Sequence, residues 1–402
     1  MSIIVNDNTF DIFAKRLNTD SIKFDFNEKF NKPNGLIPLW IADMDFMSPV
    51  EVRNALAAKV EHGIYGYSDT REDYHEIVKA WFKNGFGYSV ESDWIVETPG
   101  IVFALATAIR AFTDFGDAIL IQPPVYPPFA ETISLNERRV VLNPLKYENY
   151  TYSLDLHDFE HKIVSEDVKM FILCSPHNPI GRVWTFDELK HMTEICKKHK
   201  VLIISDEIHA DFVYEGHKHL MLPTVAPDMA HQIVTCTSPS KTFNLAGLQI
   251  SNLFISNPKL KQKFSAELLR TGYHSPTLMG IEACKAAYQY GKPWLNDLLL
   301  YLKGNIDYFK TTIEQEIPEI KVIVSEGTYL VWIDFNALNL TQHDLDKLMQ
   351  DSAKLWLNSG TTFGYGGEGF QRINMATHRT IIEQATKQLV DAIKNKKLQE
   401  AL

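Results

Sequence analysis

The chain has 402 residues, of which 45% are hydrophobic and 22% are charged, and its formal net charge is -10. A chain of this length can bury a large core and form two or three domains. The excess of acidic residues argues against nucleic acid or an anionic membrane as a main partner, because both attract Lys and Arg. We therefore expect a small-molecule partner, with no nucleic acid and no membrane.

The first residues do not have the pattern of an export signal. Residues 1–8 lack the basic region and the long apolar run of a secretory signal, and no later apolar run is long enough to span a bilayer. The chain has no C-x-x-C pair, and its four cysteines are widely spaced: Cys174, Cys196, Cys236 and Cys284. These features predict a cytoplasmic protein with buried free thiols.

Short apolar runs alternate with helical patterns between residues 95 and 256. One helical pattern opens directly after Gly100, and a later one begins where Thr185 and Glu188 have the spacing of a capping box. Runs this apolar fit strands that are covered on both faces, and four of them occupy residues 118–122, 170–174, 201–205 and 233–237. The alternation predicts an α/β fold with a mostly parallel sheet flanked by helices.

The pattern changes from about residue 286. A long polar helix is followed by apolar runs at residues 322–324 and 329–333, a Gly-rich loop and a terminal amphipathic helix. This order predicts a smaller α+β domain. We expect a segment of residues 1–50 that contributes to the small domain, a large domain of residues 51–285 and a small domain of residues 286–402.

Each of the four predicted strands is followed by a loop segment rich in Pro, polar or aromatic residues. The segments lie at residues 123–126, 175–181, 206–209 and 238–244. In open α/β sheets ligands bind beyond the carboxyl ends of the strands, so these segments are the place to look for chemistry. Each feature alone is ordinary, since an Asn-Pro pair is a common turn and a single Lys or Asp is usually a solvated surface residue.

The ordered set of Asn178, Asp206 and Lys241 resembles the class I/II aminotransferase superfamily of pyridoxal-5′-phosphate (PLP) enzymes, of fold type I. The resemblance covers most of the chain. It implies that Lys241 holds PLP as an imine, that Asp206 pairs with the pyridine nitrogen, and that Asn178 hydrogen-bonds the ring hydroxyl. The implied roles fit the chemistry, because the cofactor aldehyde needs an amine and a protonated ring withdraws electrons best.

The same resemblance implies the other cofactor contacts. Tyr126 stacks on the ring face. Ile101 and Val102 open a helix whose N–H groups and dipole suit the phosphate, and Ser238 and Ser240 add hydroxyl groups.

Substrate contacts are also implied by the resemblance. Arg372 matches the residue that pairs with the substrate α-carboxylate, a task suited to a planar guanidinium, with Arg379 as the alternative. Tyr67 matches a residue that reaches the phosphate and substrate of the neighbouring subunit in a homodimer with shared active sites. Tyr65 remains open as the residue used instead, and Asp43 is a further substrate-binding candidate.

Two positions depart from common aminotransferases. His209 replaces a Tyr three residues after the Asp, where it contacts the cofactor, and Gln249 replaces an Arg eight residues after the Lys. Four longer motifs, at residues 38–46, 65–68, 205–211 and 238–244, are similar to the cystathionine β-lyase and cystalysin branch. That similarity implies a carbon–sulfur β-lyase that acts on L-cystathionine or related cysteine S-conjugates.

In this reading Lys241 removes the Cα proton, a thiolate leaves from Cβ, and pyruvate and ammonia form after hydrolysis. Tyr126 is the candidate that protonates the leaving sulfur. A PLP-dependent aminotransferase shares the early steps and is the first alternative; a transcription-regulator-binding protein with residual lyase activity is the second. No metal is expected, because His209, His217 and His219 lack a clear set of carboxylate ligands.

Overall fold

The structure is a computed structural model that describes residues 9–400. Residues 1–8, on which the expected absence of an export signal rests, lie outside the described residues. Within the described range, no helix is both long and apolar enough to cross a membrane. All four cysteines are buried and free, as predicted.

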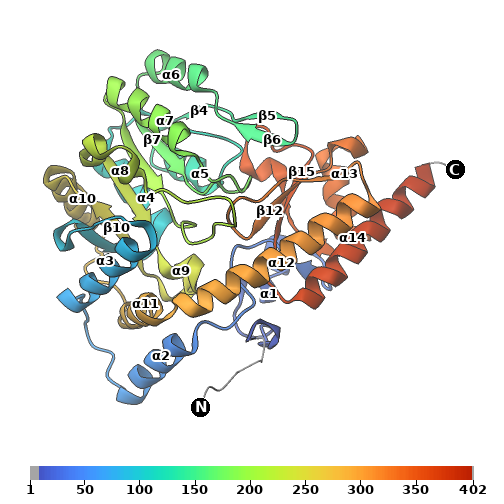
Figure 1. Ribbon diagram of the computed structural model, residues 1–402, viewed down its shortest axis with the longest axis horizontal. Helices are drawn as coiled ribbons and strands as arrows, with labels where there is room; N and C mark the ends of the chain where they lie inside the picture. Colours follow the sequence, from blue (N-terminus) through green and yellow to red (C-terminus); the bar gives the residue numbers. More distant parts are fainter. Residues whose placement is uncertain (1–8, 401–402) are drawn as a thin grey trace.

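A seven-stranded sheet forms the centre of the molecule (Figure 1). The strands from β9 to β4 are parallel, and β10 runs antiparallel to both of its neighbours. The predicted α/β class with a mostly parallel sheet is therefore confirmed, and all four predicted strands lie in this sheet. In spatial order the strands are β2 (Ile95–Thr98), β10 (Ser251–Ile255), β9 (Ile233–Thr237), β8 (Leu202–Asp206), β7 (Val168–Cys174), β3 (Ala118–Ile121) and β4 (Arg139–Leu142).

Helices cover both faces of this sheet, which explains why its central strands β3 and β7 are largely apolar. Along β7, Met170 and Ile172 join the core beneath α4 (Ile101–Phe112), α5 (Pro128–Leu135) and α10 (Pro258–Arg270). The alternate residues Phe171 and Leu173 join the opposite core, beneath α6 (Leu156–Ser165) and α7 (Phe186–His199). Side chains alternate along a strand, so one apolar run supplies both cores.

The capping box predicted for α7 is present. Thr185 Oγ1 accepts a hydrogen bond from the Glu188 amide at 3.2 Å, and Glu188 Oε2 accepts from the Thr185 amide at 2.8 Å. Two backbone donors that the first helical turn leaves unpaired are thereby satisfied.

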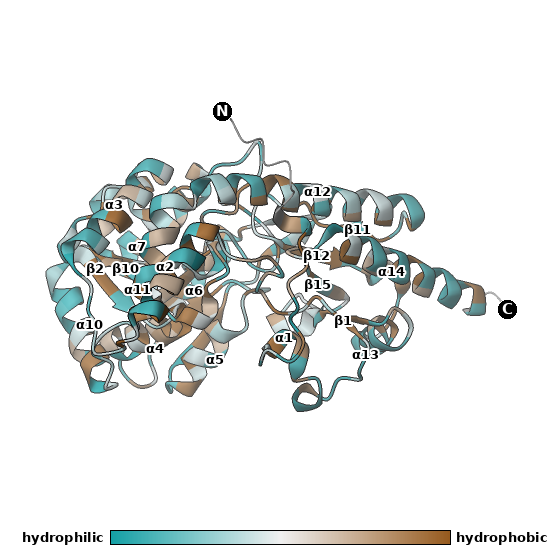
Figure 2. Cartoon of the chain, turned by 90° about the horizontal axis from the view of Figure 1, so that it is seen from below, coloured by the Kyte–Doolittle hydropathy of each residue, from teal (hydrophilic) through white to brown (hydrophobic). Residues whose placement is uncertain are grey.

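The C-terminal part contains a second sheet of four antiparallel strands. Its strands are β11 (Lys321–Val322), β12 (Leu330–Asp334), β15 (Phe370–Asn374) and β14 (Asn358–Ser359). The long helices α12 (Lys292–Glu316) and α14 (Arg379–Glu400) pack together beside it. In Figure 2 these outer helices are largely hydrophilic in colour, whereas β2 and β10 are brown between their covering helices.

The N-terminal segment is joined to this C-terminal part. β1 (Ile37–Pro38) pairs in parallel with β13 (Leu355–Trp356), and Figure 1 shows the blue segment lying against the orange and red elements. The domain limits at residues 50 and 285 remain predictions. The other elements are α1 (Ile22–Asp25), α2 (Val50–His62), α3 (Glu72–Phe86), β5 (Lys146–Glu148), β6 (Thr151–Ser153), α8 (Leu222–Val225), α9 (Pro239–Thr242), α11 (Leu278–Tyr290) and α13 (Gln342–Lys347).

Candidate active site

A cavity of about 170 Å³ lies where the central parallel strands end. The carboxyl ends of β7 and β8 contribute Cys174 and Asp206, and the start of α4 and the short helix α9 close other sides. Eight of the residues predicted for the site line this cavity: Ile101, Val102, Tyr126, Asn178, Asp206, His209, Ser240 and Lys241. The cavity therefore brings together segments that are more than 100 residues apart in the sequence.

Lys241 is a buried amine on α9. Its Nζ donates a hydrogen bond to the carbonyl oxygen of Ala42 at 2.6 Å. The pKa of Lys241 is lowered to about 8, mainly by burial and also by the nearby Arg372, while Asp43 and Asp206 oppose this change. The amine can therefore lose its proton near neutral pH, which a nucleophile or a general base requires.

Asp206 ends β8 with its side chain buried. Burial raises the pKa of this carboxyl group to about 7, although Oδ1 accepts a hydrogen bond from the Ile208 amide at 3.2 Å and Lys241 also favours ionisation. A cation placed against Asp206 would hold it ionised. A protonated pyridine nitrogen is such a cation.

His209 faces the same cavity as a neutral ring. Burial lowers its pKa to about 3, with smaller contributions from the cations Lys241 and Arg372. Its Nδ1 is buried and has no hydrogen-bond partner among residues 9–400. A buried polar atom without a partner is costly, so a ligand group that pairs with it would be stabilised here.

Arg372, on β15, is a buried guanidinium whose hydrogen bonds all go to neutral oxygens. Nη1 donates to Asn178 Oδ1 at 2.9 Å, and Nη2 donates to Asn358 Oδ1 at 2.6 Å and to the Trp40 carbonyl at 2.8 Å. Burial lowers the pKa of Arg372 to about 10. Because its amide oxygen accepts from Arg372, Asn178 keeps the amide nitrogen to donate into the cavity.

Donors suited to a phosphate lie at another side of the cavity. Ile101 and Val102 form the first turn of α4, where backbone N–H groups are unpaired. Ser240 and Gln249 also line this wall. Ser238 does not line it: its hydroxyl donates to the Ile250 carbonyl at 2.8 Å and lies 2.8 Å from Ser240 Oγ, so it holds Ser240 from behind.

Several predicted residues lie away from the cavity. Tyr67 is fully exposed, and Tyr65 is exposed with its hydroxyl donating to the Val60 carbonyl at 3.2 Å. Asp43 pairs with Arg16 at 2.6 Å, and its side chain does not line the cavity. Arg379 begins α14 with its guanidinium over the ring of Tyr308. Arg372 does not line the cavity either. It lies directly behind the lining residue Asn178, to whose Oδ1 its Nη1 donates, and is therefore the arginine that contacts the cavity wall.

Sequence reasoning missed the backbone that closes the site. The Ala42 carbonyl accepts from both Lys241 and the hydroxyl of Tyr329, the latter at 3.0 Å. The supports of Arg372 at Trp40 and Asn358 were also missed. These contacts join residues 14 to 332 positions apart, and no local pattern marks them. Gln249 was noticed only as a departure from a family pattern.

The chemistry of this donor set fits PLP. The same cavity is lined by an amine with a lowered pKa, a buried carboxyl group, the N-terminus of a helix, and a histidine whose buried Nδ1 has no partner among residues 9–400. Over residues 9–400, no three His, Cys, Asp or Glu side chains are grouped so that they could hold a metal ion.

Comparison with known proteins agrees with this fit. Residues 35–393 match the family described as aminotransferase class I and II. The chain is 38% identical to the cystathionine beta-lyase PatB of Bacillus subtilis, over 96% of this chain and 99% of that protein. It also resembles two crystal structures: cystalysin from Treponema denticola, which contains PLP (34% identity, TM-score 0.93, 96% of this chain and 98% of that one), and a PLP-bound C-S lyase from Staphylococcus hominis (31%, 0.91, 97% and 98%). The sequence-based recognition is confirmed, and the chain belongs to the class I and II aminotransferase family.

Proposed function

We propose that this chain is a PLP-dependent carbon–sulfur β-lyase. Its substrates are L-cystathionine or related cysteine S-conjugates, which it splits into a thiol, pyruvate and ammonia. The observation that carries the proposal is the similarity over nearly the whole chain to proteins named cystathionine beta-lyase and C-S lyase. The cavity around Lys241 supplies the groups that such a reaction needs.

PLP, when bound, supplies a conjugated ring that withdraws electrons from the substrate Cα. The carboxylate of Asp206 holds a proton at the ring nitrogen, because a buried anion is stabilised by an adjacent cation. The Asn178 amide N–H would donate a hydrogen bond to the ring oxygen, and Tyr126 would pack against the ring. His209 lies beside them as a neutral imidazole.

The start of α4 would hold the phosphate. The N–H groups of Ile101 and Val102 point out of the first helical turn, and the helix dipole favours an anion there. The Ser240 hydroxyl adds a donor, and Ser238 fixes its position through the 2.8 Å contact between their oxygens. Gln249 replaces the arginine of common aminotransferases with a neutral donor on the same wall.

The proton transfers fall to Lys241 and Tyr126. Arg372 binds the substrate carboxylate and orients Cα toward the amine of Lys241, which removes the Cα proton. Burial raises the pKa of Tyr126 to about 12, so its phenol keeps its proton at neutral pH. A phenol that remains protonated can donate to the sulfur as the Cβ–S bond breaks.

The protein acts as a homodimer in this proposal, with Tyr67 of one copy reaching the site of the other. Support comes from the loop between α2 and α3, where Ile64, Tyr65 and Tyr67 are all exposed. Exposed apolar side chains gathered on one loop suit an interface. We further propose a cytoplasmic location, which the four buried free cysteines support.

The test is incubation of the PLP-supplemented protein with L-cystathionine and no keto acid. We expect free thiol and pyruvate to form in equal amounts over many turnovers. Lys241→Ala, which removes the amine, is the inactive control. Product that forms only after 2-oxoglutarate is added would identify an aminotransferase instead and overturn the proposal.

A further inference from the structure

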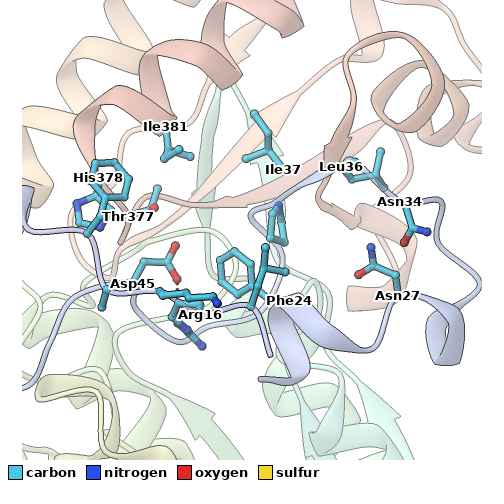
Figure 3. A pocket seen from close by; sticks show the side chains of 16 residues that line it. Arg16, Phe24, Asn27, Asn34, Leu36, Ile37, Asp45, Thr377, His378 and Ile381 are labelled. Carbon is cyan, nitrogen blue, oxygen red and sulfur yellow. Dashed lines mark hydrogen bonds and ion pairs between the residues drawn. The ribbon is translucent and has the colours of Figure 1, made fainter. Parts of the chain in front are cut away.

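Four charged side chains form a cluster around residues 43–45, next to the Ala42 carbonyl that contacts Lys241. Arg16 lies 2.6 Å from Asp43 and 2.8 Å from Asp45, and Lys23 lies 2.9 Å from Asp45 and 3.6 Å from Asp43. Lys23 is completely buried and Asp45 nearly so. Figure 3 shows Arg16 beside Asp45 in the wall of a separate, largely apolar cavity. We refer to Arg16, Lys23, Asp43 and Asp45 as the charge cluster.

The charge cluster includes and contacts the chain segment whose Ala42 carbonyl binds Lys241. Asp43 and Asp45 flank Met44 on this segment, and the neighbouring Ala42 carbonyl accepts the hydrogen bond from Lys241. Arg16 Nη1 also donates to the Met44 carbonyl, at 2.6 Å. Arg16 therefore holds the backbone of this segment in place and also neutralises charge on its carboxylates, Asp43 and Asp45.

Two asparagines hold the same segment from other elements. Asn244 Nδ2 donates to the carbonyls of Met44 and Phe46 at 2.9 and 3.0 Å. Asn374 Nδ2, at the end of β15, donates to the carbonyls of Ile41 and Asp43 at 2.7 and 2.6 Å. Residues 41–46 are thus held by several side chains, and this one segment contacts both Lys241 and Arg16.

The electrostatic balance at Lys241 includes Asp43. Burial and Arg372 lower the pKa of the amine, whereas Asp43 and Asp206 raise it, and Asp43 is the larger of these two opposing contributions. Other titratable side chains near Lys241 are uncharged: His209 is neutral, and burial raises the pKa of Tyr126, Cys174 and Tyr329, so that these keep their protons. Asp43 is the member of this set that carries its own counter-ion, Arg16.

We propose that Arg16 is a positioning residue for the proton chemistry of Lys241. It holds Asp43 at a fixed place and offsets the negative charge that Asp43 directs at the amine. This inference rests on the proposed function, because the amine of Lys241 must give up its proton to act. Without Arg16, the negative charge of Asp43 would be less compensated and would stabilise the protonated nitrogen of Lys241 more strongly.

Removing Arg16 and removing Asp43 should have opposite effects on the protonation of the Lys241 nitrogen. Arg16→Met leaves Asp43 with less compensation, so the nitrogen of Lys241 should keep its proton to higher pH. Asp43→Asn removes the anion, so the same nitrogen should lose its proton at lower pH. Both side chains are about one-fifth exposed, so we expect shifts of about 0.5 to 1 pH unit in each direction.

The experiment is a pH titration of the visible absorption of the PLP-loaded protein, whose colour reports the protonation of the nitrogen joined to Lys241. The midpoint should rise in Arg16→Met, fall in Asp43→Asn, and stay low in the double variant, since Arg16 acts through Asp43. The acidic limb of the kcat/KM profile should move in the same directions. Arg139→Met removes another ion-paired arginine, at 3.1 Å from Glu166, and should leave the midpoint unchanged.

A purely structural role for Arg16 predicts a different pattern. General loosening of the segment would shift both single variants in the same direction, or neither, and that result would overturn the inference. If Arg16→Met does not fold, Arg16→Gln and Asp43→Asn must still move the midpoint in opposite directions. A wild-type protein with lyase activity but unmoved variant midpoints contradicts this inference alone, whereas a wild-type protein that takes up no coloured cofactor contradicts the proposed function too.

Discussion

Arg372 shows how the site is prepared for an anion at the level of one side chain. Its hydrogen-bond partners among residues 9–400, on Asn178, Asn358 and Trp40, offer only neutral oxygens, and its buried Nε has no hydrogen bond there. A buried charge without a counter-ion is costly in the free protein. A bound carboxylate removes that cost, so the burial that destabilises the free site favours substrate binding.

Arg372→Gln should therefore impair substrate binding. A charge-assisted hydrogen bond contributes about 1.5–3 kcal/mol, so kcat/KM should fall by about 10- to 100-fold, mostly through KM. Arg379→Gln is the matched control, because Arg379 lies on α14 over Tyr308, away from the cavity. Steady-state kinetics with cystathionine measures both variants. A larger fall of kcat/KM in Arg379→Gln than in Arg372→Gln would contradict the prediction, because it would show that Arg379 binds the substrate carboxylate.

Asp206 should make the stability of the cofactor-free protein depend on pH. Its folded-state pKa of about 7 lies above the ordinary value of 3.8, so the folded protein binds the extra proton between these values. The free energy of unfolding should therefore fall as pH rises through this window. Asp206→Asn cannot ionise, so its free energy of unfolding should not fall with pH in this way. The variant should be more stable than wild type by up to roughly 4 kcal/mol at pH 8, but by only about 1–2 kcal/mol at pH 5.

Urea unfolding of the two cofactor-free proteins at both pH values measures this difference. PLP should reverse the order, because the ring cation stabilises the ionised carboxylate of the wild type alone. A stability difference that is the same at pH 5 and pH 8 would show that Asp206 is not protonated in the folded chain.

At the scale of elements, short local signals determine where helices begin. α7 begins with two reciprocal hydrogen bonds between Thr185 and Glu188, and α6 begins with Asp155 accepting from the Asp158 amide at 3.0 Å. Each involves residues only three positions apart, so the sequence pattern is sufficient to identify them. The strands that carry the site residues can also be identified from a local signal, since a short apolar run reflects burial of the strand on both faces.

Thr185→Ala should lower the free energy of unfolding by about 1 kcal/mol, because one amide of the first turn of α7 loses its acceptor. Lys190→Ala is the control on the same helix: its exposed side chain makes only a 3.9 Å ion pair with Glu194, and its loss should change little. Chemical denaturation measures both. Equal losses in the two variants would contradict a specific contribution from the cap.

At the scale of the whole molecule, the site is assembled from distant parts of the chain. The N-terminal segment reaches the C-terminal part through the β1–β13 pair and covers Lys241 with the Ala42 carbonyl. Tyr67 and Tyr65, by contrast, extend into solvent from the loop between α2 and α3. An exposed residue with an expected role at the site points to a second copy.

Mixing two inactive variants tests the proposed sharing of sites. Lys241→Ala and Tyr67→Ala should each lose activity, while dimers that contain one chain of each keep one intact site. Random exchange of subunits should restore up to about a quarter of wild-type activity. Mixing Lys241→Ala with Tyr65→Ala in the same way tests whether Tyr65 is the tyrosine that reaches the neighbouring site. No recovery in either mixture would mean that neither tyrosine acts across an interface.

Much of the site could be read from the order of motifs. Asn178, Asp206 and Lys241 follow apolar strands, and parallel strands place their carboxyl ends at one edge of the sheet, so their meeting is a consequence of the fold class. The antiparallel direction of β10 could not be read in the same way. The apolar run of a strand records its burial, and carries no information on which way the strand runs beside its neighbours.

Local pattern was enough to identify the strands and the cap of α7, because each depends on neighbours a few residues away, and the motif around Lys241 was enough to single out this lysine as the candidate. The support of Arg372 by Asn358, the Ala42 carbonyl over Lys241 and the pairing of Arg16 with Asp43 depended on packing. These contacts bring together side chains and backbone from separate elements, and their geometry exists only once both cores have formed. Burial in that assembly, rather than residue type, is what moves the proton affinities of Lys241 and Asp206 toward neutral pH.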